Sequence, residues 1–155
     1  MRSPRGPIYP TRSIRGGGAI VELAICLPLL MVILLVCVDG CRLFFAYTTI
    51  ANAARNGALW ATDPLANNAI AGITSQSPYA SVTAAAEADT TNLNPSLASE
   101  ITAGTGSVTQ SGTVTAGSTV TVTVTYKFTP ITSYLGMSSI TMKRAAAMVV
   151  APLAP

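Results

Sequence analysis

Twenty consecutive residues near the start of the chain, residues 19–38, are apolar apart from one carboxylate, Glu22. As an α-helix, twenty residues are about 30 Å long, which matches the hydrocarbon core of a bilayer. A carboxylate at the centre of that core costs roughly 2.5 to 3.5 kcal/mol on insertion scales, and less near its edge, where Glu22 lies. The pattern therefore predicts a membrane-spanning segment over residues 19–38 and suggests that Glu22 is kept for a reason other than insertion.

The helical pattern continues beyond this apolar run. Apolar residues recur at spacings of three and four on one face, whereas polar residues occupy another face. The apolar positions are Leu43, Tyr47, Ile50, Ala54, Ala58 and Ala61, and the polar positions are Thr48, Asn52, Arg55 and Asn56. We expect one long helix over residues 19–61, ended by Thr62-Asp63-Pro64. Its apolar stripe is expected to pack on the chain's own sheet, and packing on neighbouring subunits along other turns stays open.

The stretch after this helix has weaker signals. Residues 67–77 form a polar sequence that predicts a loop. Residues 79–90 predict a short helix that Ser77-Pro78 leads into, and residues 93–106 predict either a second short helix or irregular chain.

Alternating periodicity replaces the helical pattern in the last third of the chain. Residues 120–128 alternate between apolar or aromatic and polar side chains, which is typical of a half-buried strand, and Pro130 ends it. Residues 107–114 supply a shorter partner across a turn. Residues 140–150 predict a third strand, with its alternation disturbed at Arg144.

These elements divide the chain into three parts. They are a basic leader (1–17), a long helix (18–62) that contains the membrane span, and an outer region of loop, short helices and sheet (63–155). Three antiparallel strands with one apolar face need a cover, and the long helix is the obvious element to provide it. The predicted fold class is α+β, with a small antiparallel sheet packed on the outer half of the long N-terminal helix.

Basic residues gather ahead of the apolar run. Four arginines, Arg2, Arg5, Arg12 and Arg15, lie in the first 18 residues with no acid among them. This segment therefore has a net charge of +4 and the remainder has −1, which gives the total of +3. Because basic residues beside a membrane span stay on the cytoplasmic side, we expect the N-terminus in the cytoplasm and everything after Asp39 outside it. The remainder has no basic, aromatic-interleaved stretch, so nucleic acid is not an expected partner.

Catalysis and metal binding lack their usual residues in this chain. There is no histidine, and no cysteine lies in the outer region. Hydrolytic triads, thiol catalysis and zinc sites therefore lack residues that they need. Glu87 and Asp89 are a close acidic pair that a solvated helix face explains, because a calcium loop needs more oxygen ligands at fixed spacing. We expect a chain that is not an enzyme and that uses no cofactor, metal or small-molecule substrate.

The three cysteines all lie in or at the edge of the apolar run. At 100° per residue, Cys26, Cys37 and Cys41 fall on one face of the helix. Small apolar packing residues are the expected role, since the outer region then has no pair for a disulfide. Acylation of Cys41 as a lipoprotein is a further alternative, although Asp39 is unusual just before the small residue of such a signal. A cleaved secretory signal fits less well, because its apolar core has about 7 to 15 residues and a small-residue site follows it.

Four motifs follow one another in the first third of the chain. They are Arg15-Gly16-Gly17-Gly18-Ala19-Ile20-Val21-Glu22-Leu23-Ala24, Leu27-Pro28-Leu29-Leu30, Asp39-Gly40-Cys41-Arg42-Leu43-Phe44-Phe45-Ala46-Tyr47 and Ala51-Asn52-Ala53-Ala54-Arg55-Asn56-Gly57-Ala58. In this order they resemble the N-terminal signature of the TadE-like family. That family comprises pseudopilins, or minor pilin-like proteins, of the bacterial tight-adherence (Tad/Flp) pilus and secretion system.

The resemblance implies a processing site. In this family's pilin-like signal a prepilin peptidase cuts after a glycine, so that glutamate becomes the fifth residue of the mature chain. Counting back from Glu22 places the cut between Gly17 and Gly18. A run of glycines has no side chains to obstruct the approach of a peptidase to the backbone. In related pilins the glutamate pairs with the new amino terminus of a neighbouring subunit, which implies an assembly role for Glu22.

The resemblance also implies a function, a location and partners. It describes a structural, pilin-like subunit held in the bacterial inner membrane by one span or carried into an extracellular fibre. Its partners are the membrane, a prepilin peptidase and other pilin or pseudopilin subunits. The alternative is an uncleaved single-pass membrane protein whose outer domain binds envelope components.

Overall fold

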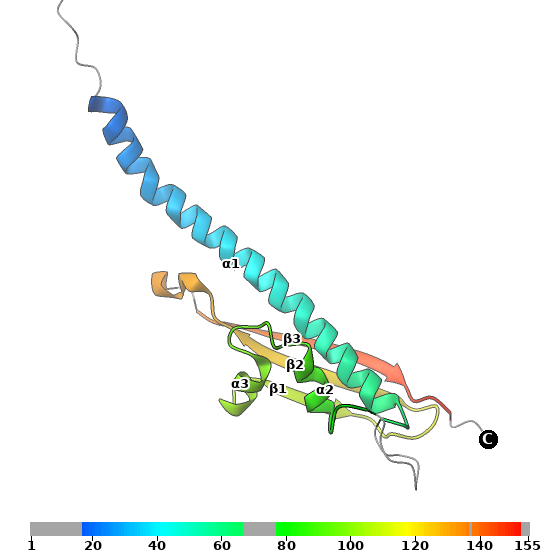
Figure 1. Ribbon diagram of the computed structural model, residues 1–155. Helices are drawn as coiled ribbons and strands as arrows, with labels where there is room; N and C mark the ends of the chain where they lie inside the picture. The colour runs from blue at the N-terminus through cyan, green and yellow to red at the C-terminus, as the bar shows by residue number, and fades with distance from the viewer. Residues whose placement is uncertain (1–16, 67–76, 137, 153–155) are drawn as a thin grey trace, which may run out of the picture.

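A computed structural model describes residues 17–66, 77–136 and 138–152, and its dominant element is the helix α1 (Gly17–Thr62). This 46-residue helix confirms the long helix expected from the apolar stripe. It ends two residues before Pro64, and Thr62 Oγ1 donates to the carbonyl of Ala58 (2.9 Å) in its last turn. The outer part of α1 lies along the sheet, whereas its N-terminal half projects away from the rest of the chain (Figure 1).

The sheet has three antiparallel strands in the order β1-β2-β3. These are β1 (Ser107–Ser111), β2 (Thr119–Phe128) and β3 (Ile140–Val149), which confirms the three predicted strands. In β2 the burial alternates residue by residue, as its sequence indicates. β1 is shorter than residues 107–114 because Gly112 takes a left-handed conformation with φ of 100°, which ends the extended strand.

The core lies between one face of the sheet and the outer half of α1. Ile50 is fully buried against the inward side chains of β2, among them Val124 and Tyr126. Toward the C-terminal end of α1, Ala58 packs with Val120 and Val122 in a second cluster. The apolar stripe of α1 is thus buried by the chain's own sheet from Ile50 onward.

Two short helices and a 3-10 helix complete the described fold. α2 (Val82–Ala88) packs on α1, and α3 (Leu97–Thr102) packs near β1 and β2. Ser81 and Ser96 cap their N-termini by accepting a hydrogen bond from the backbone amide of the third residue of each helix. Both α2 and α3 lie within the stretches where short helices are expected. η1 (Ile131–Leu135) links β2 to β3. Of the expected loop at residues 67–77, residues 67–76 lie outside the described residues.

Candidate functional site

The N-terminal half of α1 is bare in the single chain. Every residue over positions 17–38 is exposed except Leu35, which is half-buried. Ile20 and Ile25 each expose about 70% of their surface. By length and composition α1 can cross a membrane, and it lies near the N-terminus. So much contiguous apolar surface is unfavourable in water, which fits a single-pass membrane protein.

Glu22 is the one carboxylate on this bare half of α1. It is exposed, and within the described residues it makes no hydrogen bond or ion pair. Gly18 lies four residues earlier on the same face of the helix, about 6 Å away along the axis. The carboxylate is therefore available to a donor from outside its own folded domain.

Gly17 and Gly18 are the first two residues of α1. A methyl group added at either would meet no described atom within 4 Å. Gly57 differs, because a methyl there would lie 3.0 Å from a methyl of Val122 and 3.3 Å from one of Val82. Close packing therefore accounts for glycine at position 57 but not at positions 17 and 18.

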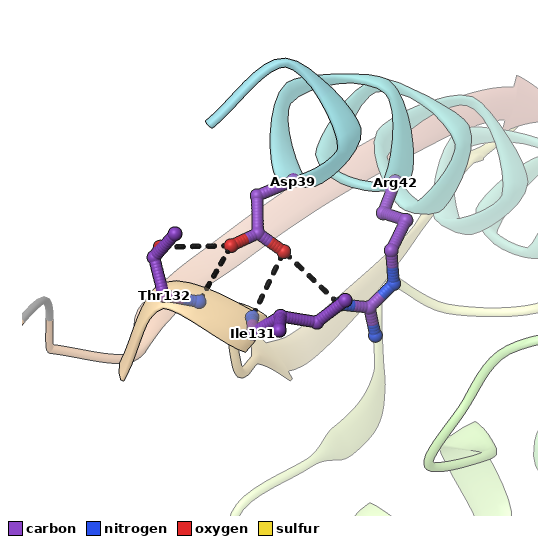
Figure 2. A network of polar contacts seen from close by, with 4 residues as sticks. All are labelled: Asp39, Arg42, Ile131 and Thr132. Carbon is purple, nitrogen blue, oxygen red and sulfur yellow. Dashed lines mark hydrogen bonds and ion pairs between the residues drawn. The ribbon is translucent and has the colours of Figure 1, made fainter. Parts of the chain in front are cut away.

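Asp39 anchors the bare half of α1 to the folded domain. The backbone amides of Ile131 and Thr132 each donate to its carboxylate at 2.8 Å, as does Thr132 Oγ1. Arg42, one turn later on α1, donates to the same carboxylate at 3.1 Å. Figure 2 shows the carboxylate pointing from α1 at the start of η1, with these donors around it. We call this group of Asp39, Arg42, Ile131 and Thr132 the Asp39 clamp.

The clamp holds Asp39 in its charged form. Burial raises the pKa of Asp39, but the hydrogen bonds from Thr132, Ile131 and Arg42 outweigh it and lower the pKa from 3.8 to about 2. Pro130, the residue that precedes η1, makes no side-chain cap. Asp39 caps η1 instead, because it accepts hydrogen bonds from the first two backbone amides of η1. The first residue after the predicted span is thereby fixed to the start of η1, which follows β2 in the chain.

Two arginines strengthen the contact between α1 and the sheet. The Arg42 guanidinium lies over the ring of Phe128, 5.4 Å from its centroid. Arg144 lies over the ring of Tyr47 at 4.3 Å. Arg144 therefore disturbs the alternation of β3 because its side chain covers an aromatic residue of α1 instead of entering the core.

The cysteines and acidic residues form no reactive or metal-binding group in the described chain. Cys26, Cys37 and Cys41 are free and exposed on α1. Asp89 is exposed at the end of α2, where it accepts a hydrogen bond from Asn56 Nδ2 (2.6 Å). Over the residues described, no three His, Cys, Asp or Glu side chains gather as metal ligands would.

The clamp is a feature that the sequence pattern does not predict. Asp39 at the end of an apolar run, with Arg42 three residues later, signals a polar role for this turn of the helix. Neither residue indicates its partner, because Thr132 lies 93 positions away. The predicted site residues Gly17, Gly18 and Glu22 lie together on the first turns of α1, and the structure does not bring them to the clamp.

A model of the family described as TadE-like protein matches residues 17–59. The match lies within α1 and includes Glu22, Asp39 and the packed part of the helix, so it confirms the resemblance seen in the sequence motifs. The match covers 43 of the 155 residues, so it shows that this part of the chain is similar to TadE-like proteins. No curated protein matches the chain. No solved structure matches it either.

Proposed function

We propose that this chain is a pseudopilin-like subunit of a Tad-type pilus or secretion assembly. One observation carries the proposal: the bare, apolar half of α1 bears a lone exposed carboxylate and is anchored by the Asp39 clamp to a small folded domain. The match to the TadE-like family over residues 17–59 supports it. A subunit of this design can present its helix to other helices while its domain stays outside the membrane.

Orientation follows from charge. The four arginines of the leader keep the N-terminus in the cytoplasm, so the domain after Asp39 lies outside it. The membrane is then the bacterial inner membrane. A reporter fused after Pro155 is expected to behave as extracytoplasmic, and cytoplasmic activity of that fusion would contradict this orientation.

Processing is the second part of the proposal. A prepilin peptidase cuts between Gly17 and Gly18, which makes Glu22 the fifth residue of the mature chain. Support comes from the open space around both glycines, because no described contact requires the absence of a side chain there. A peptidase that must approach the backbone does require a position without a side chain.

Assembly is the third part. After the cut, the amine of Gly18 is a positive charge at the start of the apolar helix, and Glu22 is a negative charge one turn away. Between neighbouring subunits, the Glu22 carboxylate of one pairs with the Gly18 amine of the next. In a low-dielectric setting a lone charge is costly, so this pairing favours a defined axial offset between adjacent helices.

Replacement of Glu22 tests the proposal. Glu22→Ala should leave the inserted amount of protein unchanged or raised, because a charge is removed from the apolar run. The amount that co-purifies with other pilus components should fall, because the neighbouring amine loses its partner. Leu23→Ala is the matched control, since it trims the adjacent exposed residue and keeps the charge. Equal co-purification of the Glu22→Ala variant and wild type at equal insertion would exclude the inter-subunit pair.

A further inference from the structure

One end of the sheet lies at the level where α1 leaves the predicted membrane span. η1 directly follows β2 and is bound by Asp39, the first residue after that span. Phe128, the last residue of β2, lies under the guanidinium of Arg42. Arg42 is four residues beyond residue 38, or about 6 Å along the helix axis. We call this end of the sheet, the last residues of β2 and the first of β3, the membrane-proximal end.

The only two lysines of the chain, Lys127 and Lys143, lie at this end. Lys127 pairs with Thr141, and Lys143 pairs with Thr125. Because directly opposed residues share a face, the two lysines are diagonal neighbours on the outer face of the sheet, about 7 to 8 Å apart at the backbone. Neither makes an ion pair within the described part of the chain.

The outer face around the lysines carries no acidic residue. Its other positions on β2 and β3 are small or hydroxylated: Thr119, Thr121, Thr123, Thr125, Thr141, Ala145 and Ala147, with Val149 at the far end. The positive charge at the membrane-proximal end is therefore not neutralised within its own face.

Charge is separated along the domain. Arg42, Lys127, Lys143 and Arg144 outnumber the acids Asp39 and Glu100, the latter in α3 close enough to act on Tyr126, so the membrane-proximal end has a net charge of +2. The far end has Arg55 with Asp63, Glu87 and Asp89, a net charge of −2. Asp89 is bonded to Asn56, which lies 18 residues beyond residue 38, or about 27 Å farther along α1. The domain thus carries its positive charge toward the membrane and its negative charge away from it.

We propose that Lys127 and Lys143 bind anionic phospholipid headgroups of the membrane that α1 spans, and so set the tilt of the outer domain on that surface. The proposal rests on the membrane placement of α1 in the proposed function. The headgroup layer adds about 5 to 8 Å on each side of the hydrocarbon core, which is the height of Phe128 and Lys127 above it. The flexible four-carbon stem of each lysine brings its ammonium group to the phosphates.

The arrangement also agrees with the insertion of the chain. The outer flank of the span contributes only Arg42 and Arg55 within about 20 residues, against four arginines in the leader. Lys127 and Lys143 come to the membrane only after the domain folds, because they are more than 80 residues farther along the chain. Their charges therefore act on the folded domain without opposing translocation.

The experiment uses the full chain in lipid nanodiscs made from phosphatidylcholine alone or with phosphatidylglycerol. Selective ¹⁵N-lysine labelling gives one backbone amide signal for each lysine, and a spin label on lipid headgroups broadens signals that lie near it. We expect both lysine signals to broaden more in the discs with phosphatidylglycerol, and about 0.5 M salt to remove the difference.

Single variants test the lysines themselves. In Lys127→Gln the signal of Lys143 remains observable, and in Lys143→Gln the signal of Lys127 does. In each variant the signal of the remaining lysine is expected to lose its extra broadening. Removal of one lysine near an anionic surface lowers the affinity for that surface about fivefold. Arg55→Gln is the matched control, because it removes one exposed positive charge from the far end and should retain the extra broadening.

Equal broadening in both kinds of disc, with the chain incorporated in each, would overturn the headgroup contact and leave the proposed function standing. That result would favour an acidic protein, instead of lipid headgroups, as the partner of the membrane-proximal end. A chain that does not enter either disc would contradict the membrane placement itself, and both proposals with it.

Discussion

Asp39 and Thr132 are joined by two hydrogen bonds of 2.8 Å, although 93 residues separate them in the chain. Through this contact the turn of α1 that leaves the predicted span is fixed to the end of the sheet. A force or displacement applied to the bare half of α1 is therefore passed to the outer domain through a short, charged connection and not only through the apolar core.

Asp39→Asn tests the clamp. The amide of asparagine offers one acceptor oxygen where the carboxylate offers two, and its NH₂ group faces the donors of η1, so at least one donor loses its partner. The amides of Ile131 and Thr132 should exchange with solvent faster, and the midpoint of thermal unfolding should fall by several degrees. Hydrogen exchange followed by NMR measures the first effect. As a control, Glu87→Gln removes a charge outside the clamp and should leave both amides protected. If Asp39→Asn protected the two amides as well as wild type does, the clamp would add no stability.

The same carboxylate predicts a pH dependence. Because the pKa of Asp39 is lowered to about 2 by folding, its contribution to stability is fully present above the ordinary value of 3.8 and is lost as the pH falls through 2. The difference in unfolding temperature between wild type and Asp39→Asn should therefore be constant above about pH 4 and shrink between about pH 4 and pH 2. A difference that stays constant down to pH 2 would mean that Asp39 does not titrate with a lowered pKa.

Close packing of α1 on the sheet is tested at Gly57. A valine there would collide with Val122 and Val82, and overpacking of this kind costs about 1–3 kcal/mol of unfolding free energy. Gly40→Val is the matched control, since Gly40 lies in the same helix with no neighbour within 4 Å of an added methyl group. Its effect should stay within about 0.5 kcal/mol. Denaturant unfolding in detergent compares the two, and equal stability would contradict the tight contact.

The elements with strong periodicity could be predicted from sequence because their side chains repeat. The spacing of Ile50, Ala54 and Ala58 indicates a helix face, and the alternation of residues 120–128 indicates a strand with one buried face. These patterns arise from local geometry, so they are visible without knowledge of the partner. The end of β1 is not visible in the alternation, because it depends on the left-handed conformation of one residue, Gly112.

The contacts of single polar residues could not be predicted in the same way. Asp39 ends an apolar run and Arg144 interrupts an alternating pattern, which indicates that each makes a polar contact. Their partners, Thr132 and Tyr47, are set by how α1 lies on the sheet, and no short-range pattern encodes that docking. For Glu22 the limit is different, since its expected partner is an amine on another subunit.

Gly17→Val tests the processing site. A branched side chain crowds the backbone carbonyl at which the peptidase acts, so trimming should be blocked and the precursor should accumulate. The folded domain should be unaffected, because a side chain at position 17 meets no described atom within 4 Å. Gel mobility separates the precursor from the shorter mature form. The same shift in the variant as in wild type would exclude Gly17 as the residue before the cut.

In the proposed function the chain becomes a trimmed subunit whose fifth residue is Glu22. The most direct measurement is the mass of the N-terminal peptide of the protein extracted from membranes. If the leader is cut after Gly17, the mature chain begins at Gly18. A chain that begins at Met1 or Arg2 would show an uncleaved single-pass membrane protein, and an acylated N-terminal Cys41 would show a lipoprotein. Either result would exclude the trimmed pseudopilin-like subunit.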